Sequence, residues 1–157
     1  VLAYKWLLEQ GYPSERIIIA GDSAGGGLAL ATALYIRDHD MLMPAALITM
    51  SAWTNLNYKR WTSPYIGNDR ADNPYISPVY GEFDGFPPML MQVGGDEMLL
   101  NDTIEVAQKA KEAGVSVRQT TYPGMFHVFQ MLFPEIPEAN EAWDEIEEFI
   151  KEICSEK

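Results

Sequence analysis

The chain has only one cysteine, Cys154, among its 157 residues. A single cysteine cannot form an intrachain disulfide, so the fold cannot be a small scaffold held by internal disulfides. The sequence also shows no secretory signal peptide. The single cysteine favours a reducing compartment, and the expected location is the cytoplasm.

Basic residues and long apolar runs are also scarce. There are 11 Lys and Arg residues against 23 Asp and Glu, which gives a formal net charge of −12. An acidic chain is a poor partner for nucleic acid or for an anionic membrane surface. No apolar run is long enough to span a bilayer. The hydrophobic content of 47 % can still fill the core of one soluble domain.

Residues 21–25 read Gly-Asp-Ser-Ala-Gly, a G-x-S-x-G motif. An apolar run at residues 17–20 predicts a strand before the motif, and the apolar residues after it predict a helix. A strand, a tight turn and a helix are the context that a nucleophile elbow requires. The motif therefore predicts that the hydroxyl of Ser23 is exposed for nucleophilic attack, near the N-terminus of the helix.

Two further residues complete a candidate catalytic triad. Asp96 follows a predicted buried strand at residues 89–93, and His127 follows a second predicted strand at residues 115–122. The order serine, acid, histidine is that of α/β-hydrolases. The rival acids are Glu97, Asp102 and Asp84, of which Asp102 is expected to help begin the next helix. The other histidine, His39, lies at a polar helix end and is interpreted as a solvated terminal cation.

The residue types explain the expected chemistry. A serine hydroxyl is a weak nucleophile unless a base removes its proton, and an imidazole titrates near neutral pH. His127 is therefore the expected base for Ser23, and Asp96 would hold the ring in the useful tautomer. This chemistry requires no metal and no cofactor.

Three segments together resemble the hormone-sensitive-lipase-like family of α/β-hydrolases, which includes many microbial carboxylesterases. They are Gly-Asp-Ser-Ala-Gly-Gly at residues 21–26, Val-Gly-Gly-Asp-Glu at 93–97 and Pro-Gly-Met-Phe-His-Val-Phe at 123–129. The resemblance implies hydrolysis of small-molecule esters with short to medium acyl chains, with Ser23, Asp96 and His127 as the triad. It also implies that the backbone N–H of Ala24 is one oxyanion donor.

The chain departs from this family in several ways. Family members have a His-Gly-Gly-Gly type motif upstream of the serine, which supplies further oxyanion donors, and no such motif is present. Only residues 1–14 lie before the segment that forms the first predicted strand, and the stretch at 57–72 is short for the family. We therefore expect residues 1–157 to be a partial catalytic domain, the C-terminal half of a longer enzyme. Its expected partners are an N-terminal segment or a second copy of the chain.

The predicted elements alternate between helix and strand, which favours an α/β fold with a mostly parallel sheet and helices on both faces. Residues 53–85 are interpreted as a long loop with a short helix. Apolar residues in the last predicted helix share one face, and five acidic residues occupy the other. The predicted helices lie at residues 1–10, 26–38, 102–113 and 139–153, and the predicted strands at 17–20, 45–52, 89–93 and 115–122.

Three functions are compatible with this sequence. The first is a serine carboxylic-ester hydrolase, which a complete triad favours. The alternatives are a serine peptidase of the same fold and a non-catalytic binding half-domain. Four large side chains near the triad could line an acyl pocket or could belong to the ordinary core: Trp53, Met125, Phe126 and Phe129.

Overall fold

A computed structural model of the protein describes residues 1–57 and 64–155. Its centre is a parallel sheet with strand order β1-β2-β3-β4, which confirms the expected α/β fold. The strands are β1 (Ile18–Asp22), β2 (Ala46–Met50), β3 (Met89–Gly94) and β4 (Val117–Tyr122). Residues 58–63 of the short stretch at 57–72 lie outside the described part.

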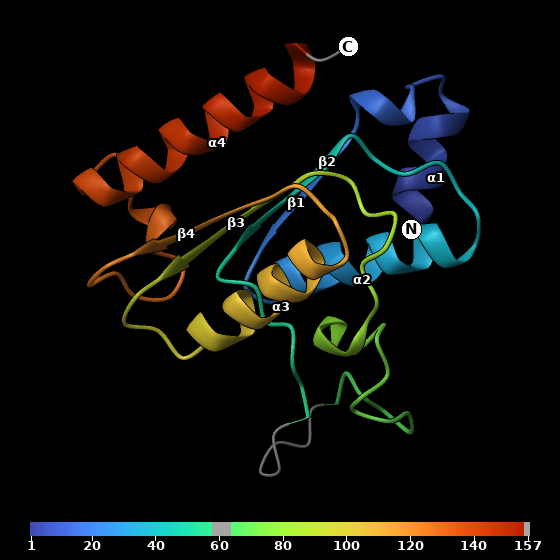
Figure 1. The fold of residues 1–157 in the computed structure, drawn as a ribbon, viewed down its shortest axis with the longest axis horizontal. Coiled ribbons are helices and arrows are strands. Elements are labelled where there is room, and N and C mark those ends of the chain that lie inside the picture. Colours follow the sequence, from blue (N-terminus) through green and yellow to red (C-terminus); the bar gives the residue numbers. More distant parts are fainter. Residues whose placement is uncertain (58–63, 156–157) are drawn as a thin grey trace.

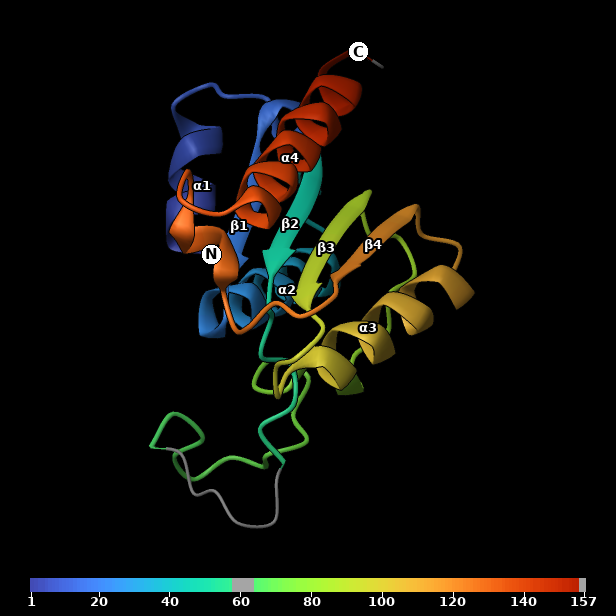
Figure 2. The same cartoon turned by 90° about the vertical axis from the view of Figure 1, so that its left-hand side faces the viewer.

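Helices cover both faces of this sheet (Figure 1). Helices α2 (Ala24–Asp38) and α3 (Leu100–Glu112) lie on one side of the strands, and α4 (Pro137–Ser155) lies on the other. Figure 2 shows α4 crossing in front of β1 and β2, with α2 partly hidden behind the strands. The loop at residues 53–85 contains a short 3-10 helix, η2 (Pro78–Tyr80), as expected.

The two faces are set by the alternation of side chains along the strands. Leu47, Met89 and Met91 point toward α2 and α3, whereas Ala46, Ile48 and Leu90 point toward α4. Successive side chains of a strand point to opposite faces, so a strand that is buried on both faces reads as a continuous apolar run. This alternation explains why the central strands β2 and β3 read as nearly continuous apolar runs, although each core takes only every second residue.

Helix α1 (Leu2–Glu9) packs beside the first strand. Its Tyr4 is buried with Ile17 and Ile36, and the Tyr4 hydroxyl donates a 2.7 Å hydrogen bond to the carbonyl of Leu42. Among the described residues β1 pairs with β2 alone, so its other edge has no strand beside it. A hollow of about 410 Å³ follows this edge. Helix α2 was expected to be buried on most sides, but Leu28 lines this hollow and is 57 % exposed.

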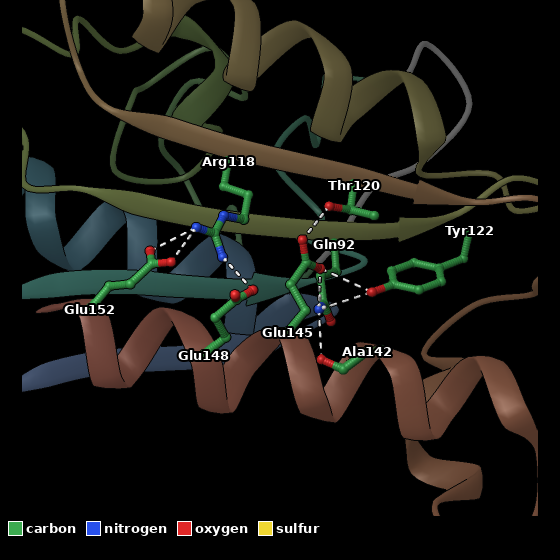
Figure 3. A network of polar contacts seen from close by, with 8 residues as sticks. All are labelled: Gln92, Arg118, Thr120, Tyr122, Ala142, Glu145, Glu148 and Glu152. Carbon is green, nitrogen blue, oxygen red and sulfur yellow. Dashed lines mark hydrogen bonds and ion pairs between the residues drawn. The ribbon is translucent and has the colours of Figure 1, made fainter.

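Polar side chains join α4 to β3 and β4 (Figure 3). The carboxylate of Glu145 accepts hydrogen bonds from Gln92 Nε2 at 2.8 Å, Thr120 Oγ1 at 2.6 Å and Tyr122 Oη at 2.9 Å. Burial, and then the contact with Glu145, raise the pKa of Tyr122 well above its usual value. Glu145 is one of the five acidic residues opposite the apolar face of α4, and it binds side chains of the sheet. Its partners come from β3 and β4, so the pattern within the helix could not reveal them.

Candidate active site

Ser23 lies in a tight turn between β1 and α2, as the motif predicts. Its backbone has φ 50° and ψ −119°, a conformation that residues other than glycine rarely adopt. A Cβ atom on Gly21 would lie 2.3 Å from the carbonyl oxygen of Gly25, so the turn can close only with glycine at position 21. The Ser23 N–H donates to the carbonyl of Met50 at 2.9 Å, which ties the turn to the end of β2.

The imidazole of His127 lies against this serine. His127 Nε2 and Ser23 Oγ are 2.9 Å apart, although the two residues are 104 positions apart in the sequence. The loop after β4 brings them together because it turns at Gly124, which has φ 75°. The loop is also fixed to the end of β3, where the Asp96 N–H donates to the carbonyl of Met125 at 2.9 Å.

The carboxylate beside the histidine belongs to Glu97 and not to Asp96. Glu97 Oε1 lies 3.2 Å from His127 Nδ1, and the Glu97 side chain is only 1 % exposed. The expectation that Asp96 contacts the histidine is therefore wrong. Strand β3 ends at Gly94, and the turn that follows leaves Asp96 exposed and directs the next side chain inward. Sequence alone could not choose between two adjacent acids, because the choice depends on the direction of this turn.

The second carboxylate oxygen of Glu97 is also bound. Glu97 Oε2 accepts a 2.6 Å hydrogen bond from the Ser51 hydroxyl and a 3.0 Å hydrogen bond from the Gly94 N–H. Hydrogen bonds to a carboxylate are among the stronger ones in proteins, and they hold the group in place for the ring. The motifs in the sequence did not identify Ser51 as a site residue. The signal available there was a serine directly after a buried apolar strand.

The other candidate acids lie elsewhere. Asp102 is buried in the first turn of α3, and its carboxylate accepts hydrogen bonds from Thr54 N–H at 3.1 Å and Asn55 N–H at 3.0 Å. It was expected to help begin its own helix, but it binds the loop after β2 instead. Asp84 is exposed, and its carbonyl faces the Arg37 side chain at the other end of α2. His39 lies just after α2, with its ring stacked on Tyr35 at 3.7 Å between centroids.

An apolar cavity of about 290 Å³ adjoins the turn that holds Ser23. Trp53 and Leu56 line it from the loop after β2, and Ala24 and Leu28 line it from α2. The loop approaches α2 so closely that a Cβ on Gly27 would lie 2.1 Å from the carbonyl oxygen of Trp53.

The other three proposed pocket residues do not line this cavity. Phe129 is fully buried beside Tyr122, and Met125 packs against the same cluster. Phe126 is 47 % exposed. Of the four large side chains considered from sequence, only Trp53 therefore belongs to the cavity wall.

Ala24 is the first residue of α2. The first N–H groups of a helix have no partner within the helix, and they point along the axis toward any negative charge beyond its end. The Ala24 N–H has no acceptor within α2, so it can donate to an oxyanion that develops beside Ser23.

The arrangement contains the parts of a serine nucleophile, a base and an acid that orients the base. In the part of the chain that the structure describes, no group of three His, Cys, Asp or Glu residues is placed to hold a metal ion. Within residues 1–57 and 64–155, no helix has the length and apolarity needed to cross a bilayer.

Comparison with known proteins gives a consistent picture. The family described as alpha/beta hydrolase fold matches residues 1–131. An acetyl-hydrolase of Streptomyces hygroscopicus is 34 % identical over 99 % of this chain, and an esterase of Acinetobacter venetianus is 37 % identical over 93 %. The chain spans 59 % of the first relative and 55 % of the second.

Solved structures agree. An esterase/lipase from an uncultured bacterium has a TM-score of 0.90 and 35 % identity over 98 % of this chain. A hormone-sensitive lipase from a metagenome library has a TM-score of 0.89 and 37 % identity over 96 % of this chain. The match covers 58 % of each of those two chains.

Proposed function

Because the chain belongs to the hormone-sensitive-lipase-like family of α/β-hydrolases, we propose that it hydrolyses carboxylic esters through an acyl-enzyme on Ser23. The observation that supports this best is the continuous contact from Ser23 Oγ to His127 Nε2 and from His127 Nδ1 to Glu97 Oε1, at 2.9 and 3.2 Å. Both distances are within or close to hydrogen-bond reach, which a nucleophile and its base need.

The first half of the reaction acylates the serine. Ser23 Oγ attacks the carbonyl carbon of the ester while His127 Nε2 takes its proton. Glu97 accepts the hydrogen bond from Nδ1–H and stabilises the imidazolium, the role that sequence reasoning gave to Asp96. The N–H of Ala24 donates to the oxyanion of the tetrahedral intermediate. When the carbon–oxygen bond to the alcohol breaks, His127 returns the proton to the leaving alkoxide.

The second half releases the acid. His127 removes a proton from water, which attacks the acyl carbon, and the same oxyanion donor acts again. Collapse of this intermediate breaks the bond to Ser23 Oγ, which regains its proton from His127. No step uses a metal or a cofactor, because the protein groups supply both the nucleophile and the proton transfers.

The substrate class follows from the cavity and the relatives. The lining is almost wholly apolar and includes Trp53, Leu56 and Leu28, so it suits the hydrocarbon part of an ester. Its volume of about 290 Å³ is at the small end for ligand pockets. The relatives are named acetyl-hydrolase and esterase, and we therefore favour short to medium acyl groups.

We propose further that residues 1–157 form part of a larger catalytic domain. The chain spans 59 % and 55 % of two full-length relatives, and the open edge of β1 lies beside the Ser23 turn. The Ala24 N–H is one oxyanion donor, whereas enzymes of this type use two or more. A neighbouring segment at this edge would pair with β1 and add the remaining donors.

Turnover of p-nitrophenyl butyrate by the full-length gene product tests the proposed function. Ser23→Ala should abolish nearly all turnover. Only the small rate enhancement that the oxyanion donors supply without a nucleophile should remain above the uncatalysed rate. Ser116→Ala is the matched control, because Ser116 is an exposed serine in the loop before β4. Unchanged turnover in Ser23→Ala would contradict the proposal, and a preference for peptide anilides over esters would favour a peptidase.

A further inference from the structure

The end of β2 and the turn that follows it contact Ser23, Glu97 and the backbone of Val128, the residue after His127. The backbone of this segment brackets the serine, because the Ser23 N–H donates to the carbonyl of Met50 and the Trp53 N–H donates to the carbonyl of Ser23, both at 2.9 Å. The side chain of Ser51, which lies between them in the sequence, contacts Glu97 and the backbone of Val128. These residues therefore form a junction between the elbow, the loop after β3 and the loop after β4.

Ser51 is fully buried and uses its hydroxyl twice. The O–H donates to Glu97 Oε2 at 2.6 Å, and the oxygen accepts the N–H of Val128 at 3.1 Å. Val128 directly follows His127. One hydroxyl thus holds the carboxylate that contacts the ring and also the backbone next to the ring.

Ser51 and Val128, which are joined by the second of these hydrogen bonds, both have a positive φ. Ser51 has φ 51° and Val128 has φ 54°, in the left-handed region that favours glycine. A β-branched residue such as valine is especially unfavourable there. Such conformations persist only where the surrounding contacts require them, and they concentrate at functional sites.

We propose that Ser51 is a positioning residue, whose hydroxyl fixes Glu97 and the His127 loop relative to each other. The inference rests on the proposed function. With the hydroxyl in place, the imidazole has a carboxylate on Nδ1 and a fixed backbone beside it, so Nε2 faces Ser23. Without it, Glu97 Oε2 keeps only the Gly94 N–H, and the Val128 N–H loses its partner.

A neighbouring hydroxyl provides a matched control. Thr49 lies on β2 two residues before Ser51 and is 1 % exposed, and its Oγ1 has no hydrogen-bond partner among the described residues. Thr49→Val deletes a buried hydroxyl two residues from Ser51 without breaking a hydrogen bond. Removing an unsatisfied hydroxyl is nearly neutral, so this variant should keep the kcat and KM of the wild type.

The test compares Ser51→Ala with Ser51→Gly in the full-length gene product. Both variants lack the hydroxyl. Glycine also adopts a positive φ without strain, so Ser51→Gly should keep the stability of the fold. We expect both to lower kcat for p-nitrophenyl butyrate by about ten- to a hundredfold, the range for a lost hydrogen bond to a charged group. KM should change little, because Ser51 does not line the cavity. Rates are expressed per mole of folded protein.

Proton NMR gives a readout that does not depend on turnover. The His127 Nδ1–H proton, hydrogen-bonded to Glu97, should give a downfield signal in the wild type and in Thr49→Val. This signal should weaken or move in both Ser51 variants. A purely structural role for Ser51 would leave it unchanged in the folded fraction of Ser51→Gly.

The possible failures are distinct. Wild-type kcat in Ser51→Gly, or an unchanged His127 signal in both variants, would overturn the positioning role while leaving the esterase proposal intact. Unchanged turnover in Ser23→Ala would instead overturn the esterase proposal, and the NMR comparison would still show whether Ser51 positions the His127–Glu97 pair.

Discussion

The ring of His127 faces the second of two adjacent acids: its Nδ1 lies 3.2 Å from Glu97 Oε1. The preceding residue, Asp96, is exposed, and its backbone N–H binds the carbonyl of Met125 instead. The contact between His127 and Glu97 means that Glu97, and not Asp96, can orient the base.

Glu97→Gln should lower kcat for p-nitrophenyl butyrate by about 10³–10⁴-fold, because an amide in that place favours the wrong imidazole tautomer. Asp96→Asn is the matched control, since it removes a neighbouring charge that does not contact the ring. It should keep kcat close to that of the wild type. The reverse result, a large loss of kcat in Asp96→Asn and a small loss in Glu97→Gln, would show that Asp96 is the acid of the triad.

Gly94 should tolerate no side chain. A Cβ there would lie 2.3 Å from the carbonyl oxygen of Met125, which belongs to the loop that holds His127. Gly94→Ala should therefore lower the free energy of unfolding by about 1–3 kcal/mol or more, as overpacking does, and should reduce activity as well. Urea denaturation measures the first effect and ester turnover the second.

Gly81→Ala is the control for this substitution. Its closest contacts would be the ends of the Leu34 side chain, at 2.8 and 2.9 Å, and these can move. Its cost in stability should be smaller and its turnover normal. Equal losses in the two variants would show that close approach of the His127 loop is not the reason for glycine at position 94.

Alkaline pH should weaken the attachment of α4 through Tyr122. Its pKa is raised in the folded state, so the free energy of unfolding is constant below pH ~10 and falls as the pH rises above that value, where tyrosine in the unfolded chain ionises. Tyr122→Phe should lower stability at neutral pH by about 1.5–3 kcal/mol through loss of the hydrogen bond to Glu145. It should also make the alkaline decline shallower.

Urea denaturation between pH 7 and 11 measures both effects. Tyr12→Phe is the control, because Tyr12 is an exposed residue between α1 and β1. It should match the wild type at each pH. An alkaline decline in Tyr122→Phe as steep as that of the wild type would contradict the assignment of the effect to this residue.

The open edge of β1 predicts how residues 1–157 behave by themselves. Unpaired N–H and C=O groups on a strand edge invite association, and each missing oxyanion donor costs about 10²–10³ in rate. We expect this polypeptide to associate and to be almost inactive on p-nitrophenyl butyrate. The full-length gene product is expected to be active. Light scattering and ester turnover would detect the two effects, and a monomeric, fully active 157-residue polypeptide would refute the proposal.

Local patterns predicted the fold well. The apolar runs at the strands and the G-x-S-x-G motif depend on neighbours in the sequence, and the structure has the strands, the turn and the helix that they indicate. The contact between Ser23 and His127 also followed, because the carboxyl ends of parallel strands meet at one edge of the sheet.

What could not be predicted depends on contacts between distant segments. The choice of Glu97 over Asp96 follows from the direction of a turn that is fixed by hydrogen bonds to the loop after β4. Asp102 binds a loop 48 residues earlier, and Glu145 binds side chains of β3 and β4. In the sequence, Asp102 looks like a residue at the start of a helix, and Glu145 looks like an ordinary member of a polar helix face.

Trapping of the covalent intermediate tests the central proposal most directly. The full-length gene product is mixed with p-nitrophenyl butyrate, quenched with acid and digested with trypsin, and the peptides are analysed by mass spectrometry. The tryptic peptide of residues 17–37 contains Ser23 as its only serine. We predict that this peptide gains the mass of one butyryl group, on Ser23, and that Ser23→Ala gains none. A butyryl group on another residue, or full turnover with no acylation of this peptide, would contradict the proposed mechanism.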